Sequence, residues 1–198
     1  MAKRPPIRLL LIVTGSTLRA EEKDRPLAYY LKHRIEKYLH EDEEREIPPT
    51  ADSDETPDDV EDSGLGLKRD ELQIRVVADF RWIHDDLLQG LPTISLGGPG
   101  VSALAHRWLE EVPISLAVND RYFIQMDPDL EEPRVSIWGM DNISTQIAIS
   151  VFCDRFLSRF LARCATMPPT SIDSDDEEDD EEDEEFEDLE AEEDEDDL

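Results

Sequence analysis

The chain has 198 residues, enough for one ordinary domain, and its 51 acidic residues against 20 basic ones give a formal net charge of −31. Direct nucleic-acid binding is not expected from such a balance, since that binding depends on Lys and Arg neutralising phosphates. No stretch approaches the roughly 20 consecutive apolar residues of a membrane span, so we expect a cytoplasmic protein that makes no membrane contact.

The negative charge is concentrated in two segments. Residues 173–198 hold 21 acidic residues and no basic one, and residues 41–70 hold 13 acidic residues against three basic ones. Outside these segments the acidic and basic residues are equal in number, 17 of each. We therefore expect one folded domain from residues 1–40 and 71–166, a disordered acidic insertion at 41–70 and a disordered acidic tail at 167–198.

The first 40 residues predict a buried strand followed by a helix. Residues 7–13 are apolar and rich in branched side chains, as in a strand buried on both faces. After the turn 14–17, Asp24 is expected to cap a helix whose first turn contains Pro26. The apolar residues of that helix recur every four positions: Leu27, Leu31, Ile35 and Leu39.

The middle of the chain predicts two further strands, each with a helix after it. Residues 72–78 are typical of a strand, and Asp79 is expected to cap a short helix at 80–89 that Gly90 ends. A third strand at 92–96 runs into a glycine turn at 97–100, and a helix at about 101–111 follows, with Pro99 or Gly100 at its entrance.

The last part of the domain predicts three strands and one long helix. The links between strands at 114–118, 122–126 and 134–138 suit antiparallel neighbours. Both cysteines, Cys153 and Cys164, are expected on the final helix as buried residues of a reduced protein. The apolar face of that helix should lie against the sheet: Ile143, Ile147, Val151, Phe152, Phe156, Phe160 and Leu161.

This order of elements predicts an α/β fold, a Rossmann-like or flavodoxin-like three-layer sandwich with a mostly parallel sheet and an antiparallel C-terminal segment. Ligands of such sheets bind beyond the carboxyl ends of the strands. Glycine turns that lead into helices let backbone amides approach an anion, so a phosphate or carboxylate is the expected guest. The candidate binding residues follow the strands: Thr14, Gly15, Ser16, Thr17, Arg19, Asp79, Gly97, Gly98, Gly100, Asp141 and Asn142.

The same residues also have a purely structural interpretation, in which the glycines only permit tight turns and the polar side chains only cap helices. We favour ligand binding for the turn 14–17, whose three hydroxyls follow the first strand, and the structural interpretation for 97–100. Neither turn matches a GxGxxG or P-loop lysine motif.

No pattern in the sequence identifies a reaction, and whether the protein is an enzyme stays open. The four histidines fall on or beside expected helices without metal-ligand spacing, so no bound metal is expected. A weaker alternative brings Asp79, Asp120 and Asp141 together on Mg²⁺ for hydrolysis or phosphoryl transfer.

Residues 12–19, Ile-Val-Thr-Gly-Ser-Thr-Leu-Arg, and the Arg25-Pro26-Leu27-Ala28 that follows, resemble the opening of flavodoxin-like NADPH-dependent FMN reductases. Those proteins begin with a strand, a Gly-Ser-x-Arg phosphate loop and a helix. The resemblance covers residues 7–31, with Arg19 one position later than in the family pattern. It implies that Gly15, Ser16, Thr17 and Arg19 hold a phosphate, and it does not by itself imply a flavin.

Two functions follow as hypotheses. The first is binding of a phosphate-bearing small molecule, with FMN or another nucleotide as the candidate cofactor, at residues 14–19 and 97–100, where Asp79 or Asp141 would meet a ribose hydroxyl or a metal. The second is a non-catalytic interaction protein whose acidic segments bind a basic protein partner. The tail can also serve only for solubility, and exposed aromatic residues leave a homo-oligomer open.

Overall fold

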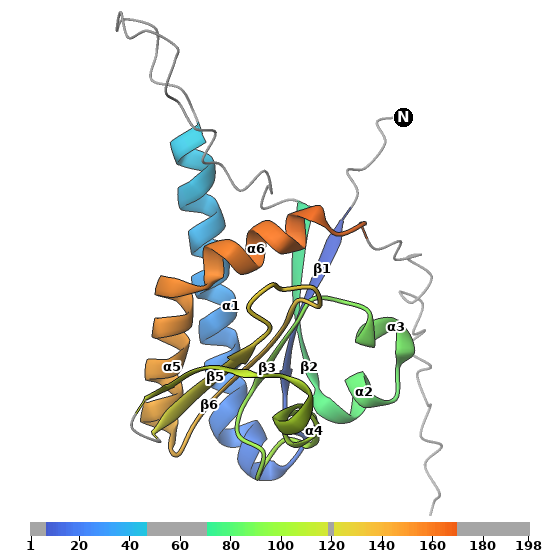
Figure 1. Cartoon of the computed structure of the whole chain (residues 1–198), viewed down its shortest axis with the longest axis vertical. Coiled ribbons are helices and arrows are strands. Elements are labelled where there is room, and N and C mark those ends of the chain that lie inside the picture. The colour runs from blue at the N-terminus through green and yellow to red at the C-terminus, as the bar shows by residue number, and fades with distance from the viewer. Residues whose placement is uncertain (1–6, 47–70, 119–120, 170–198) are drawn as a thin grey trace, which may run out of the picture.

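The computed structural model describes residues 7–46, 71–118 and 121–169. Its strands are β1 (Arg8–Thr14), β2 (Leu72–Ala78), β3 (Thr93–Leu96), β4 (Ile114–Val118), β5 (Tyr122–Met126) and β6 (Arg134–Gly139). Its helices are α1 (Leu18–Glu46), α2 (Asp79–Ile83), α3 (Asp86–Gln89), α4 (Ala103–Glu111), α5 (Asn142–Arg155) and α6 (Leu157–Thr166). Figure 1 shows the sheet between its helices.

The six strands form one sheet in the order β2-β1-β3-β6-β5-β4. Strands β2, β1, β3 and β6 run parallel, whereas β5 pairs antiparallel with both β6 and β4. The predicted α/β three-layer sandwich, with its mostly parallel sheet and antiparallel C-terminal segment, is therefore confirmed. The central place of β1 between β2 and β3 is also that of a flavodoxin-like sheet.

The helices cover both faces of the sheet because side chains alternate along β1 (Figure 1). Leu10 and Ile12 pack on one face among residues of α1, α5 and α6. Leu9, Leu11 and Val13 pack on the other with Trp82 of α2 and Trp108 of α4. All five β1 side chains are buried, as the apolar run predicted.

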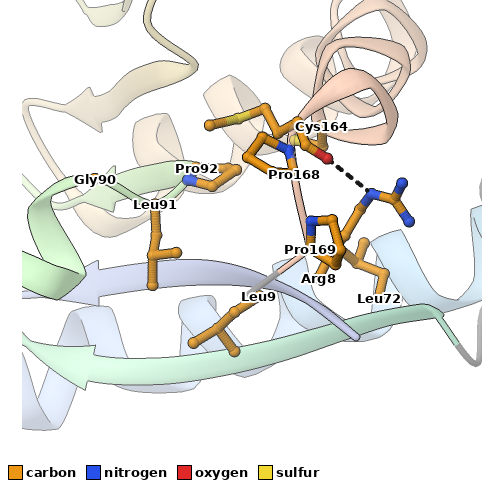
Figure 2. Close-up of a pocket in the computed structure, with 10 residues that line it drawn as sticks. Arg8, Leu9, Leu72, Gly90, Leu91, Pro92, Cys164, Pro168 and Pro169 are labelled. Atoms are coloured by element: carbon orange, nitrogen blue, oxygen red, sulfur yellow. Dashed lines mark hydrogen bonds between the residues drawn. The ribbon is translucent and has the colours of Figure 1, made fainter. Parts of the chain in front are cut away.

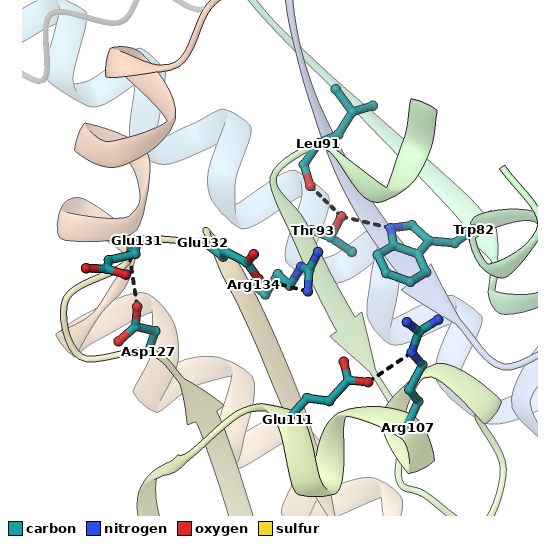
Figure 3. Close-up of polar contacts among 9 residues, drawn as sticks. All are labelled: Trp82, Leu91, Thr93, Arg107, Glu111, Asp127, Glu131, Glu132 and Arg134. Atoms are coloured by element: carbon teal, nitrogen blue, oxygen red, sulfur yellow. Dashed lines mark hydrogen bonds and ion pairs between the residues drawn. The ribbon is translucent and has the colours of Figure 1, made fainter. Parts of the chain in front are cut away.

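The two buried tryptophans lie near Arg134 at the amino end of β6, and Figure 3 shows the polar contacts of Trp82. Their rings meet edge to face with centroids 5.5 Å apart, and the Arg134 guanidinium lies 5.9 Å from each ring centre. The Trp82 indole N–H donates to the Thr93 hydroxyl over 3.1 Å, and that hydroxyl donates to the Leu91 carbonyl over 2.8 Å. These contacts fix α2 and α4 on the sheet at the edge opposite the expected ligand.

Helix α1 begins at Leu18, so the prediction that Asp24 caps it was wrong. Thr17 caps the helix instead, since its hydroxyl accepts the Ala20 N–H over 3.2 Å and its carbonyl accepts the Glu21 N–H over 2.9 Å. Pro26 lies inside the helix rather than in its first turn. The helix continues to Glu46, so residues 41–46 of the expected insertion are helical, while residues 47–70 lie outside the described residues.

The long final helix predicted from the sequence is two helices, α5 and α6, which meet at Phe156. Cys153 and Cys164 lie on different helices, and burial raises the pKa of their thiols to about 11 and about 12. Ile143 and Ile147 are 72% and 47% exposed, so the predicted apolar face is wrong for the first turns of α5. Small side chains, Ser144, Thr145 and Ala148, are buried there instead.

The remaining boundaries differ in smaller ways. The helix expected at 80–89 is divided into α2 and α3, and α4 begins at Ala103 behind Ser102, whose hydroxyl accepts the Ala105 N–H over 3.3 Å. The start of the expected tail, residues 167–169, is described, whereas residues 170–198 and the expected turn 119–120 are outside the described part. No described helix is both long and apolar enough to cross a membrane.

Candidate functional site

A cavity of about 470 Å³ lies at the carboxyl ends of β3 and β6. We call it the carboxyl-edge groove, and three segments line it: Arg19, Lys23 and Asp24 of α1, residues 98–101 after β3, and residues 138–142 with Thr145 around the start of α5. Its volume falls within the roughly 300–1,000 Å³ that is usual for small-molecule sites.

The groove follows from the topology of the sheet. The connection after β3 leads to α4 on one face, whereas the connections after β1 and β6 lead to α1 and α5 on the other. Neighbouring connections that diverge in this way open a crevice beyond the strand ends, which is where doubly wound proteins bind ligands.

The groove brings together only part of the predicted set. Arg19, Gly98, Gly100, Asp141 and Asn142 line it. The other six predicted residues are not among its lining: Thr14, Gly15, Ser16, Thr17, Asp79 and Gly97.

The turn after β1 packs against the protein's own backbone. A Cβ atom on Gly15 would lie 2.1 Å from the Val101 carbonyl oxygen, so this glycine permits close contact with the connection after β3. Thr14 is buried, Ser16 is exposed, and Thr17 caps α1. The hydroxyls that suggested a phosphate cradle therefore lie beside the groove rather than in it.

Asp79 joins the end of β2 to the start of α4. Its side chain is 2% exposed, and Oδ2 accepts the Ala103 N–H over 2.7 Å. Oδ1 is buried without a hydrogen-bond partner in the described structure. The expectation that Asp79 caps its own helix was wrong, because Ala78 holds the N-cap position of α2.

Asp141 caps α5 at the rim of the groove. Its carboxylate accepts the Ser144 N–H over 2.7 Å, and this bond lowers the pKa of Asp141 below its ordinary value. The Thr145 hydroxyl accepts the Gly139 N–H over 3.0 Å and donates to the Asp141 carbonyl over 3.0 Å. These bonds fix the connection from β6 to α5.

Gly97 makes room for Asp24, a residue that the sequence prediction had assigned only to a helix cap. Gly97 has φ +106, and a Cβ atom there would lie 2.7 Å from Asp24 Oδ2. Asp24 is 9% exposed, and burial raises its pKa from 3.8 to about 6, against the opposing effect of Arg19. Because Asp24 falls on the buried stripe of α1 with Ala20 and Leu31, a carboxylate among core positions was the signal available in the sequence.

The groove has a cationic side and an aromatic side. Arg19 and Lys23 are exposed on α1, and Lys23 pairs with Glu22 at 2.9 Å, whereas no ion pair engages Arg19 in the described residues. Across the groove, Trp138 stacks on Phe123 with ring centroids 4.1 Å apart and donates its indole N–H to Gln125 over 3.2 Å. Trp138 is thus held in place by its own neighbours.

A second cavity, of about 210 Å³, lies at the opposite edge of the sheet (Figure 2). Its lining is largely apolar, and the Arg8 side chain donates to the Met167 carbonyl over 3.2 Å and pairs with Glu71 at 3.6 Å. Because Arg8 already has these partners and the cavity is small, this cavity is a weaker candidate for ligand binding than the groove. No group of three metal-ligating side chains occurs within residues 7–46, 71–118 and 121–169.

Comparisons of this chain with models of known protein families, with curated proteins and with solved structures found no match. The resemblance of residues 7–31 to FMN reductases therefore stays a prediction. Function has to be argued from the groove itself.

Proposed function

We propose that this protein binds a phosphate-bearing small molecule in the carboxyl-edge groove, with Arg19 and Lys23 as the anion-binding side chains. The observation that carries the proposal is a cavity of about 470 Å³ that contains two cations, one of them without an ion pair in the described structure. Arginine suits phosphate especially well, because its planar guanidinium can donate two parallel hydrogen bonds.

Side chains rather than backbone amides supply the anion contacts in this proposal. Thr17 caps α1, Asp79 and Ser102 cap α4, and Asp141 caps α5, so each of these three helix starts already has at least one amide bonded to a side chain. The glycine turn 97–100 contributes access instead. A Cβ atom on Gly100 would meet nothing within 4 Å, so the groove is open at this point.

A nucleotide or FMN is the candidate ligand. Trp138 offers an aromatic wall on the side of the groove away from Arg19, and ligand pockets commonly combine such walls with a few placed polar groups. The phosphate would lie at α1 and the ring system toward β6. This arrangement specifies binding and leaves the reaction open.

Replacing Arg19 with alanine should weaken binding of the phosphate-bearing ligand by roughly 10-fold or more, since a charge-assisted hydrogen bond contributes about 1.5–3 kcal/mol. Isothermal titration calorimetry at pH 7.5 with FMN, AMP and ribose 5-phosphate measures this effect. Arg107→Ala is the matched control, because it removes an equal charge from the surface of α4, where Arg107 pairs with Glu111 at 3.0 Å. Equal affinities in Arg19→Ala and native protein would refute the proposal.

The competing hypothesis, an interaction protein whose acidic segments bind a basic partner, stays a prediction. Most of those segments lie in residues 47–70 and 170–198, outside the described residues. A homo-oligomer stays a prediction as well. The groove is the feature of the described chain that favours ligand binding.

A further inference from the structure

Asp24 is a buried carboxylate that lines the carboxyl-edge groove. The side chain is 9% exposed, it forms part of the groove lining, and Oδ2 lies against Gly97. No described residue donates a hydrogen bond to it, and the guanidinium of Arg19 acts on it electrostatically.

The other two carboxylates at this edge of the sheet differ from Asp24 in having backbone donors. Asp79 accepts from Ala103 N and Asp141 accepts from Ser144 N, each over 2.7 Å. Both stabilise the start of a helix, so the fold accounts for them. Asp24 lies inside α1, where it caps nothing, and burying a carboxylate without donors is unfavourable. No hydrogen bond or helix cap in the described residues therefore accounts for an acid at this position.

We propose that Asp24 accepts hydrogen bonds from the hydroxyl groups of a phosphorylated sugar whose phosphate is held by Arg19 and Lys23. The inference rests on the proposed function and names the ligand class within it. The sugar phosphate occurs as a free pentose phosphate, in a ribonucleotide, or as the ribityl phosphate of FMN.

The placement of these side chains favours a sugar over a base as the donor. Arg19, Lys23 and Asp24 line the same groove, and the charge of Arg19 acts on the Asp24 carboxylate. The ligand must therefore carry its anion and its donors close together. In a phosphorylated pentose or pentitol the hydroxyls lie on the carbons that follow the phosphate, whereas a nucleobase is attached beyond the sugar. An ionised carboxylate has only acceptor oxygens, which matches hydroxyl donors.

Asp24→Asn tests the inference, because it keeps the size of the side chain and removes its charge. Binding of four compounds to the native chain and to the variant is measured by calorimetry at pH 7.5: inorganic phosphate, ribose 5-phosphate, AMP and FMN. Some of the hydroxylated compounds should bind the native chain. For these, we expect the affinity of the variant to be roughly 10-fold lower. Inorganic phosphate should bind equally well or more tightly, since the variant lacks a negative charge near Arg19. The three hydroxylated compounds distinguish the free sugar, the nucleotide and the flavin as sources.

Each other outcome overturns a defined part of the account. Unchanged or tighter binding of every hydroxylated compound to Asp24→Asn would refute the role of Asp24 and leave the phosphate site intact. Equal weakening of inorganic phosphate and the sugar phosphates would also refute it, because the effect would then not depend on hydroxyls. If none of the four compounds bound the native chain, the proposed function itself would fall, and this inference with it.

Discussion

Gly15→Ala is expected to lower the free energy of unfolding by about 3 kcal/mol, at the upper end of the usual effect of overpacking. The added methyl would lie 2.1 Å from the Val101 carbonyl oxygen and 2.9 Å from the Val101 carbonyl carbon. Both atoms belong to the backbone, so no side-chain rotation can relieve the contact. The turn after β1 would have to move away from the connection after β3. That connection lines the groove.

Gly100→Ala is the matched control, because a Cβ atom there meets nothing within 4 Å. Urea unfolding followed by circular dichroism should show a change of less than about 1 kcal/mol for this variant. Equal stability of Gly15→Ala and the native protein would contradict the packing described for the turn. A charged side chain at position 15 would meet the same backbone atoms and disturb folding. Such a variant could therefore not separate a loss of ligand binding from a loss of stability.

Asp24→Asn is expected to stabilise the ligand-free protein by about 3 kcal/mol at pH 7.5, since one pKa unit corresponds to about 1.4 kcal/mol. Burial raises the pKa of Asp24 from 3.8 to about 6, so the folded state retains a proton that the unfolded state releases between these values. The free energy of unfolding that depends on Asp24 therefore falls as the pH rises through that window. Asparagine carries no charge to desolvate, so the free energy of unfolding of the variant does not fall for this reason.

The measurement is the difference in unfolding free energy between Asp24→Asn and native protein across pH. The difference should be near zero at pH 4, rise through pH 5 and 6, and stay constant above about pH 7, because the pKa of Asp24 is raised to about 6. Other carboxylates titrate in both proteins, so comparing the two largely removes their contribution. A variant less stable than the native chain at pH 7.5 would mean that the ionised carboxylate has a stabilising partner.

The strands could be predicted from the sequence because their apolar runs are short and bounded by strong turn signals. β2, β4 and β5 begin and end where the sequence predicted. Helix starts were less predictable, since Pro26 suggested a first turn although Thr17 supplies the cap nine residues before that proline. The break at Phe156 has no glycine or proline to mark it.

The position of the groove could be predicted from the sequence, but its lining could not be predicted in detail. The rule that ligands bind beyond strand ends directs attention to the edge where the groove lies, and Arg19, Gly98, Gly100, Asp141 and Asn142 do line it. Which polar residues line the groove and which pack against the protein depends on tertiary contacts. Asp79 bonds to a helix 24 residues further along the chain, and Gly15 packs against Val101, and neither contact leaves a local sequence signal.

The most direct test of ligand binding in the groove is a titration of the ¹⁵N-labelled full-length protein with ribose 5-phosphate, followed by NMR. We expect the largest amide shifts at Arg19, Lys23, Gly98, Gly100 and Asn142, which line the groove from three segments. Amides around the opposite cavity, at Leu9, Leu72 and Leu91, should stay unchanged. Shifts confined to that opposite edge, or no shifts at millimolar ligand, would contradict the assignment of the groove as a phosphate-ligand site.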